Sequence, residues 1–283
     1  VNIKGKKESE SVQQSAAAIE EWALANLPTI SIPLDLRISK LTAKSVDVLI
    51  NDLSISSPQL DAAFNWLLDD VNIQNLGLSG LKIRNKNSTD SAIDYEFSLA
   101  SKGELVLTSP YKTTLDIIVN TQSFSEFSAV NGSKIALDIS GDFSALSAKA
   151  VGSGSISTNA EIAINLIDKS LPFNGSVKLD RYPFPQELLS ILTPENFSIK
   201  VAGNKLNQSV TGSSVFSIQE YEHSLLTFEL DHQDRQFKIK KLTVENEQEK
   251  SDVSVYGTFS YGDTIAWNTD LSSTGLKVPN IAN

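Results

Sequence analysis

The stretch Ile30-Ser31-Ile32-Pro33-Leu34-Asp35-Leu36-Arg37-Ile38 places an aliphatic residue at every second position. Successive side chains of a β-strand point to opposite faces, so this stretch predicts a strand with one apolar face and one polar face. The same alternation recurs in short runs from residue 30 to the C-terminus. The sequence therefore predicts an all-β protein, a long antiparallel meander in which short turns join neighbouring strands.

Turn-forming residues separate the runs of alternation. Turns are predicted at Asn51-Asp52, Lys102-Gly103, Asn131-Gly132, Gly152-Ser153-Gly154-Ser155, Asn174-Gly175, Gly203-Asn204 and Tyr261-Gly262-Asp263. This spacing indicates about eighteen strands, and a meander of that length must close, split into two sheets or bend into a trough. At about 4.8 Å between strands, a trough would run roughly 80–90 Å.

Two stretches interrupt the alternation. Ser57 to Asp70 fits a short helix, with Ser57 as its cap and Pro58 in its first turn, and fits a strand followed by a turn equally well. Residues 181–196 are rich in proline and predict an irregular loop. No domain boundary is indicated, so residues 30–283 are expected to form one continuous segment with irregular breaks near 57–70 and 181–196.

Residues 8–27 predict an amphipathic helix before the first strand. Val12, Ala16, Ile19, Ala23 and Leu27 recur at helical spacing, and a proline follows them. The polar side of this helix lacks the basic residues that a membrane-surface helix favours. The pattern therefore favours a helix that caps one end of the sheet over a helix that lies on a membrane.

The composition excludes several classes of function. The net charge of −10 argues against binding to nucleic acid or to anionic lipid headgroups. The absence of cysteine excludes disulfides, thiolate metal sites and cysteine catalysis, and it fits an oxidising compartment. The sequence has no signal peptide and no membrane-spanning apolar run, and it begins at Val1, which indicates a processed protein or an internal piece of one.

Residues suited to catalysis or metal binding are sparse. His223 and His232 lie nine positions apart on one predicted strand, so they are expected on opposite faces at exposed strand ends, without a shared metal. The acidic groups Asp69-Asp70 and Glu245, Glu247 and Glu249 are expected on solvated strand faces rather than around Ca²⁺. No catalytic motif is present in the sequence, so we expect no enzyme activity, no cofactor and no metal site.

The aliphatic face is the remaining candidate site. In a β-sandwich it would form the core, whereas in a bent open sheet it would line a groove for acyl chains, and periodicity alone does not choose between them. The residues predicted to line such a groove are Ile30, Ile32, Leu34, Leu36, Ile38, Val46, Val48, Leu76, Leu78, Tyr95, Phe97, Leu115, Ile117, Ile135, Leu137, Ile162, Ile164, Leu166, Val177, Leu179, Leu226, Phe228, Phe237, Ile239, Val253, Val255 and Trp267.

Two sequence segments near the ends of the chain resemble the TamB family of AsmA-like proteins. The first comprises Leu27-Pro28, the run from Ile32 to Ile38, Leu41 and Val46. The second comprises the run from Ile239 to Val244, Gly257, Ile265-Ala266-Trp267, Leu271 and Gly275-Leu276. The chain has Glu249-Lys250-Ser251 where the family commonly has a glycine before the penultimate strand.

The resemblance implies a U-shaped β-taco with an apolar interior, in the periplasm of a Gram-negative bacterium. It implies a non-enzymatic conduit that carries phospholipid acyl chains between the inner and outer membranes and supports outer-membrane protein assembly. The chain would be an internal segment of a protein anchored in the inner membrane. Its partners would be neighbouring segments of the full-length chain and a TamA-like outer-membrane barrel, which a region absent from this segment would contact.

Two other functions remain open. A scaffold or chaperone would receive strands of outer-membrane barrel proteins by β-augmentation at its sheet edges. A secreted β-helix or sandwich would act as an adhesin or a carbohydrate-active enzyme, but such enzymes use aromatic platforms and paired carboxylates. The three tryptophans, Trp22, Trp66 and Trp267, are widely spaced, which disfavours this last class.

Overall fold

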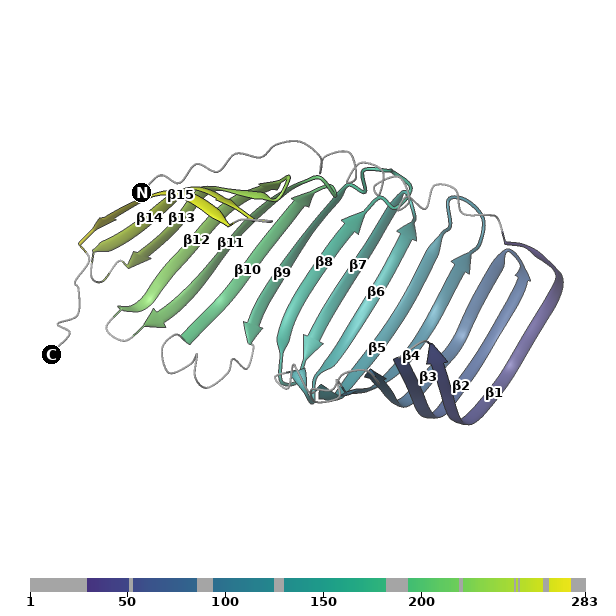
Figure 1. The fold of residues 1–283 in the computed structure, drawn as a ribbon. Helices are drawn as coiled ribbons and strands as arrows, with labels where there is room; N and C mark the ends of the chain where they lie inside the picture. The colour runs from purple at the N-terminus through teal and green to yellow at the C-terminus, as the bar shows by residue number, and fades with distance from the viewer. Residues whose placement is uncertain are drawn as a thin grey trace.

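The described residues form one sheet whose strand order is the order of the chain (Figure 1). The computed structural model describes residues 30–50, 53–85, 94–124, 130–181, 193–218, 221–246, 248, 250–261 and 265–275. Its strands are β1 (Ile32–Ile50), β2 (Leu53–Leu68), β3 (Asp70–Asn85), β4 (Asp94–Val106), β5 (Thr113–Phe124), β6 (Lys134–Asp142), β7 (Ala145–Ser153), β8 (Ser157–Ile164), β9 (Phe173–Arg181), β10 (Thr193–Gly203), β11 (Asn207–Ile218), β12 (Tyr221–Gln233), β13 (Gln236–Asn246), β14 (Ser251–Ser260) and β15 (Ala266–Thr274).

Each of these strands pairs antiparallel with its neighbours in the chain, which confirms the predicted antiparallel meander. The sheet is open, because β1 and β15 do not pair with each other. The described residues form 15 strands, compared with the predicted eighteen or so, and their sheet measures roughly 65–70 Å across its strands. The described residues contain no helix, and the predicted helix at 8–27 lies outside them.

The structure describes the first of the two interrupted stretches completely and the second only in part. Residues 57–70 belong to β2 and the first residue of β3, with a turn at Asp69, so the strand alternative is correct. Of the stretch 181–196, residues 182–192 lie outside the described part, and β10 begins at Thr193.

Predicted turns at Lys102-Gly103 and Asn174-Gly175 are wrong, because both pairs lie inside strands. Gly103 has φ 151°, and an added Cβ would lie 2.0 Å from the Thr114 carbonyl oxygen. At Gly175 an added Cβ would lie 2.8 Å from the Glu161 carbonyl oxygen. Both glycines allow the backbones of neighbouring strands to approach closely, which a sequence signal for a turn does not distinguish.

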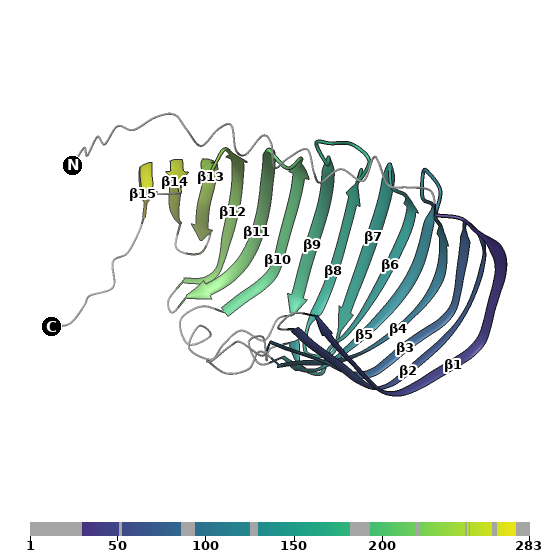
Figure 2. The same cartoon turned by 45° about the vertical axis from the view of Figure 1, so that its right-hand side comes forward.

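The first three strands are the longest and bend along their length (Figure 2). Three special residues align across these strands, Ser45, Pro58 and Gly80. Ser45 and Gly80 each have φ 54°, in the left-handed region, and Pro58 lies between them. A left-handed residue within a strand kinks it, so three aligned special residues kink three strands together.

One long side of the sheet is a row of turns that bond to one another, here called the turn rim: Asp69 and residues 107–112, 143–144, 165–172, 204–206, 234–235 and 261. The Ile30 amide donates to the Leu107 carbonyl at 3.1 Å, and the Leu107 amide donates to Asp69 at 2.7 Å. Further along, the Phe143 amide donates to Pro110 at 2.9 Å, and the Lys205 amide to Ser170 at 3.1 Å. These bonds join the turns of successive hairpins.

Few apolar side chains are buried in the part of the chain that the structure describes. Only Ala62, Leu81, Tyr111, Ile156 and Phe216 have 9% or less of their surface exposed. A sheet usually buries its apolar face against a second layer. The described residues supply no second layer, so the sheet has no sandwich core within them.

Candidate functional site: an apolar sheet face

Strand pairing aligns apolar residues into rows that cross the whole sheet. Residues opposite each other on paired strands point to the same face. One complete row, here called the third row, is Leu41, Ala62, Leu76, Ser101, Ile117, Leu137, Ala150, Ala160, Val177, Ile199, Gly212, Phe228, Leu242, Val255 and Leu271. A single hydroxyl, that of Ser101, interrupts this apolar row.

Two further complete rows lie between the third row and the turn rim, on the same face. The first row, nearest the rim, is Leu36, Trp66, Val71, Leu105, Thr113, Gly141, Leu146, Ile164, Phe173, Gly203, Gln208, His232, Phe237, Phe259 and Trp267. The second row is Ile38, Phe64, Ile73, Gly103, Leu115, Ile139, Ala148, Ile162, Gly175, Val201, Val210, Leu230, Ile239, Gly257 and Thr269. We call the face that carries these rows the apolar face.

Most of the predicted lining residues lie on the apolar face. Fourteen are in the three rows above, namely Leu36, Ile38, Leu76, Leu115, Ile117, Leu137, Ile162, Ile164, Val177, Phe228, Phe237, Ile239, Val255 and Trp267. Beyond the third row, Leu78, Ile135, Leu179, Leu226 and Val253 follow on the same strands, and Val46, Val48, Tyr95 and Phe97 follow past the bend.

Four predicted residues stand apart from these rows. Ile30 precedes β1 and is 47% exposed, and Leu166 follows β8. Leu34 lies in an irregular part of β1, where the pairing shifts, and is 68% exposed. Ile32 pairs with Leu68 in the backbone.

The opposite face is polar. One row of this face, from β4 to β13, runs through Lys102, Asp116, Asp138, Lys149, Glu161, Ser176, Lys200, Thr211, Glu229 and Lys241. Lys102 Nζ lies 3.3 Å from Asp116 Oδ2. The sheet therefore separates an apolar face from a charged one, as the alternation predicts.

Charged groups on the polar face pair with each other. Lys240 Nζ lies 2.8 Å from Asp231 Oδ2 and 3.2 Å from Glu229 Oε1, and hydrogen bonds to these carboxylates raise the pKa of Lys240. The Thr42 hydroxyl and the Gln59 amide donate to Asp61 at 2.8 and 2.5 Å and lower the pKa of that carboxyl. These pKa shifts come from solvated pairs rather than from a catalytic site.

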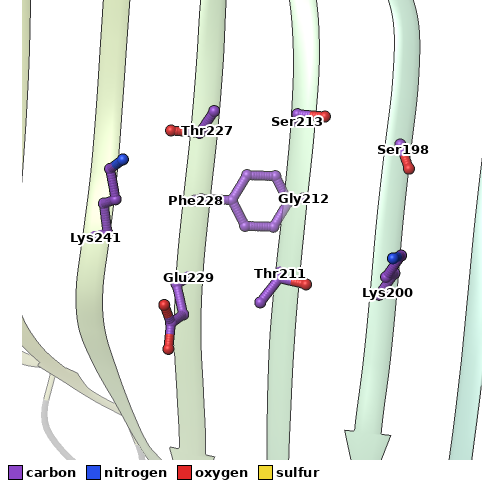
Figure 3. Close-up of a pocket in the computed structure, with 9 residues that line it drawn as sticks. All are labelled: Ser198, Lys200, Thr211, Gly212, Ser213, Thr227, Phe228, Glu229 and Lys241. Atoms are coloured by element: carbon purple, nitrogen blue, oxygen red, sulfur yellow. The ribbon is translucent and has the colours of Figure 1, made fainter.

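One hollow of the sheet is small and lined mainly by polar residues (Figure 3). It has a volume of about 330 Å³, and seven of its nine lining residues are polar: Ser198, Lys200, Thr211, Ser213, Thr227, Glu229 and Lys241. The remaining two are Gly212 and Phe228, whose ring lies over Gly212 in the close-up (Figure 3). This open depression differs from the enclosed, mainly apolar pockets that bind small molecules.

Metal-binding groups do not converge in the described residues, which contain no cluster of three or more His, Asp or Glu side chains suited to a metal ion. His223 is exposed, as expected, and its backbone has φ 53°. The same described ranges include no helix of the length and apolarity that a membrane span requires.

His232 differs from its prediction as an exposed strand-end residue, because it is half-buried on the apolar face. Its Nδ1 bonds to Gln208 Oε1, its Nε2 lies 2.8 Å from the Tyr261 hydroxyl, and its ring lies 4.6 Å from that of Phe237. A count of alternation along β12 finds Leu226, Phe228 and Leu230 two positions apart and then His232. That spacing is the signal that could have placed the imidazole on this face.

The chain was compared with protein families, curated proteins and solved structures. The family model described as "TamB, N-terminal domain" matches residues 2–283. No curated protein and no solved structure matches the chain. Proteins of the TamB family are components of the translocation and assembly module of the Gram-negative envelope, with a role in transport and assembly rather than catalysis. With a family model that matches almost every residue, an open antiparallel sheet and two segregated faces, this chain belongs to the family of TamB N-terminal domains.

Proposed function

We propose that this domain is a periplasmic lipid conduit, in which the apolar face lines a trough and carries phospholipid acyl chains between the two membranes. The third row supports this proposal most directly, because it stays apolar across all 15 described strands with one hydroxyl. Each CH₂ that leaves water on such a surface gains about 0.8 kcal/mol. A face of uniform chemistry offers an acyl chain similar affinity at each strand, so the chain can move along it.

The absence of a protein cover over this face within the described residues also supports the proposal. Leu36, Leu41, Ile162 and Val177 on this face are each 39–43% exposed. Acyl chains would bury these surfaces, while the charged headgroups remained in solvent. In this proposal the domain works as part of a longer chain anchored in the inner membrane. A region outside this chain would contact a TamA-like outer-membrane barrel.

Photocrosslinking tests the proposal on two adjacent positions of one strand. A photoreactive residue in place of Leu137, in the third row, is expected to crosslink to phospholipid, whereas one in place of Asp138, on the polar face, is expected not to. Equal lipid labelling at the two positions, or none at Leu137, would contradict the conduit.

Charge substitutions on β8 provide a functional test. Ile164→Asp places a carboxylate in the first row and is expected to abolish lipid transport, because an ionised group on an acyl path is costly to desolvate. Ala163→Asp places the same group on the polar face of the same strand and serves as the matched control. Transport that survives Ile164→Asp at the level of Ala163→Asp would rule out acyl passage over β8.

The open edges favour a second function, a scaffold for outer-membrane barrel proteins. β15 has no partner beyond it among the described strands, and all nine of its residues are exposed. Such an edge can accept a further strand by β-augmentation, either from a neighbouring segment of the full-length chain or from an unfolded barrel protein. Photoreactive residues along β15 would then trap barrel proteins, and recovery of only the chain's own segments would exclude the scaffold role at this edge.

A further inference from the structure

Two neighbouring polar side chains of the first row lie together beside the turn rim, in β11 and β12. In β1 to β4 this row carries Leu36, Trp66, Val71 and Leu105, whereas in β11 and β12 it carries Gln208 and His232. These two side chains bond to each other through Nδ1 of the imidazole. Nε2 of the same ring lies 2.8 Å from the hydroxyl of Tyr261, the residue that follows β14.

Aromatic rings hold this polar group in position. The ring of His232 lies 4.6 Å from that of Phe237 and stacks on that of Tyr261 at 5.9 Å. Phe237 also lies 5.8 Å from Tyr261 and 6.5 Å from Phe259. The ring nitrogens of His232 and the hydroxyl of Tyr261 therefore belong to rings that pack against other aromatic rings. Aromatic residues with one polar group adopt this arrangement where an apolar phase meets water.

The group lies at a boundary between apolar rows and polar turns. One row further into the sheet, its own strands carry Val210 and Leu230. On the rim side, the Gln208 side-chain amide donates to the backbone carbonyl of Asn204 in the β10–β11 turn at 2.5 Å. An acyl chain on the second and third rows would therefore place its ester and phosphodiester at the level of this group.

We propose that Gln208, His232 and Tyr261 form a subsite for the phosphodiester of a phospholipid whose acyl chains lie on the apolar face, an inference that rests on the proposed conduit. Tyr261 is 39% exposed. Its hydroxyl can turn from His232 to donate to a phosphate oxygen, and the Gln208 amide adds a second donor through its other N–H. The imidazole, whose Nδ1–H donates to Gln208 Oε1, positions both groups. The subsite fixes which end of the lipid faces the turn rim.

The test compares the full chain's affinity for a short-chain phosphatidylglycerol with its affinity for a diacylglycerol of the same chain length, which lacks the phosphodiester. The wild type is expected to bind the phospholipid about tenfold more tightly, the usual effect of hydrogen bonds to a charged group. His232→Leu and Gln208→Leu are expected to reduce this ratio to about twofold or less and to leave diacylglycerol affinity unchanged. A ratio unaffected by both variants would overturn the subsite.

Two controls guard against effects on folding. Tyr261→Phe keeps the ring contacts and removes only the hydroxyl, so a lowered ratio in this variant supports the subsite. His223→Leu changes an exposed histidine on the same strand and is expected to leave the ratio unchanged. A ratio lowered equally by His223→Leu would contradict a local role for His232.

The source of the phosphate is tested by NMR of the His232 ring protons. Addition of phosphatidylglycerol is expected to shift them, and the same concentrations of inorganic phosphate or glycerol phosphate are expected to leave them unchanged. An equal shift with inorganic phosphate would indicate a free-anion site and overturn the lipid subsite. If the conduit itself is wrong, neither lipid will bind; if only the subsite is wrong, both lipids will bind with affinities that these variants do not change.

Discussion

The strands at the two ends of the sheet use the same alternation with different lengths and different bends. β1, β2 and β3 have 19, 16 and 16 residues, whereas β13, β14 and β15 have 11, 10 and 9. The first group contains the left-handed residues Ser45 and Gly80, and the last group contains Gly257, whose φ is 148°. Figure 2 shows the longer strands curving around the sheet and the shorter ones ending early.

The two ends also differ in how exposed their apolar residues are. Trp66 and Trp267 lie in the same row, yet Trp66 is half-buried and Trp267 is 78% exposed. The Trp66 indole also donates to the Leu68 carbonyl at 2.9 Å. Trp66 lies on β2, between two paired strands, whereas Trp267 lies on β15, the last of the described strands, whose outer side is left for another molecule or another segment of chain.

Alanine substitutions at Gly257 and Gly80 should have the largest effects on the free energy of unfolding, and these two effects should differ most from each other. Gly257→Ala places Cβ 2.2 Å from the Asn268 carbonyl oxygen and should lower the free energy of unfolding by about 3 kcal/mol or more. Gly80→Ala meets only a Pro58 ring carbon at 3.4 Å and should cost about 1–2 kcal/mol, the usual penalty of a left-handed residue.

Urea denaturation of each variant measures these costs. Gly77→Ala, whose Cβ would lie 3.9 Å from the nearest atom, is the control and should stay within about 0.5–1 kcal/mol of wild type. Equal losses for Gly257→Ala and Gly80→Ala would show that the two glycine positions do not differ as described.

Removal of the two tryptophan side chains should sharpen the comparison. Trp66→Ala removes a half-buried ring and should lower the free energy of unfolding by about 2–3 kcal/mol. Trp267→Ala removes a mostly exposed ring and should change it by less than about 0.5 kcal/mol. If Trp267→Ala proved the more costly, the C-terminal strands would already bury this ring against a partner.

Low pH should slightly lower the stability of the β1–β2 pair, and high pH should slightly lower the stability of the β12–β13 pair. Hydrogen bonds lower the pKa of Asp61 between β1 and β2, so its stabilising effect is present above its ordinary pKa of 3.8 and is lost as the pH falls through the lower folded-state pKa. Hydrogen bonds to Asp231 and Glu229 raise the pKa of Lys240, so its effect is present below 10.5 and is lost as the pH rises through the higher folded-state pKa.

Amide hydrogen exchange of β1–β2 and β12–β13 across these pH ranges measures both effects relative to the unstructured chain. Asp61→Asn should remove part of the acid sensitivity of β1–β2, and Lys240→Gln part of the alkaline sensitivity of β12–β13. Either variant changing the other end instead would contradict the local origin of the pKa shifts.

Much of this fold is predictable because strict alternation of apolar and polar side chains is typical of a β-strand. Parity within each run predicts that Leu226 and Phe228 share one face of β12 and that Phe237 and Ile239 share one face of β13, and strand pairing places both pairs on the same face of the sheet. Antiparallel order follows as well, since short turns permit no other connection between neighbouring strands.

Other features depend on information that the local sequence does not carry. Gly103 and Gly175 resemble turn glycines, and only the approach of a neighbouring strand shows why they lie within β4 and β9. His232 forms its site with Tyr261, 29 residues further along the chain, a contact that depends on the register of three strands. Pairing register is set by the whole sheet, so contacts across it escape a reading of single runs.

The identity of strand order and chain order has a consequence for how such a molecule sets its reach. Each hairpin pairs only with the hairpins before and after it. Inserting or deleting one hairpin therefore moves all following strands together and disturbs the strand pairing only at the site of the change. One hairpin adds about 10 Å. The length of such a sheet therefore changes in steps of one hairpin, and the number of hairpins that the gene encodes can match the width of the gap between two surfaces.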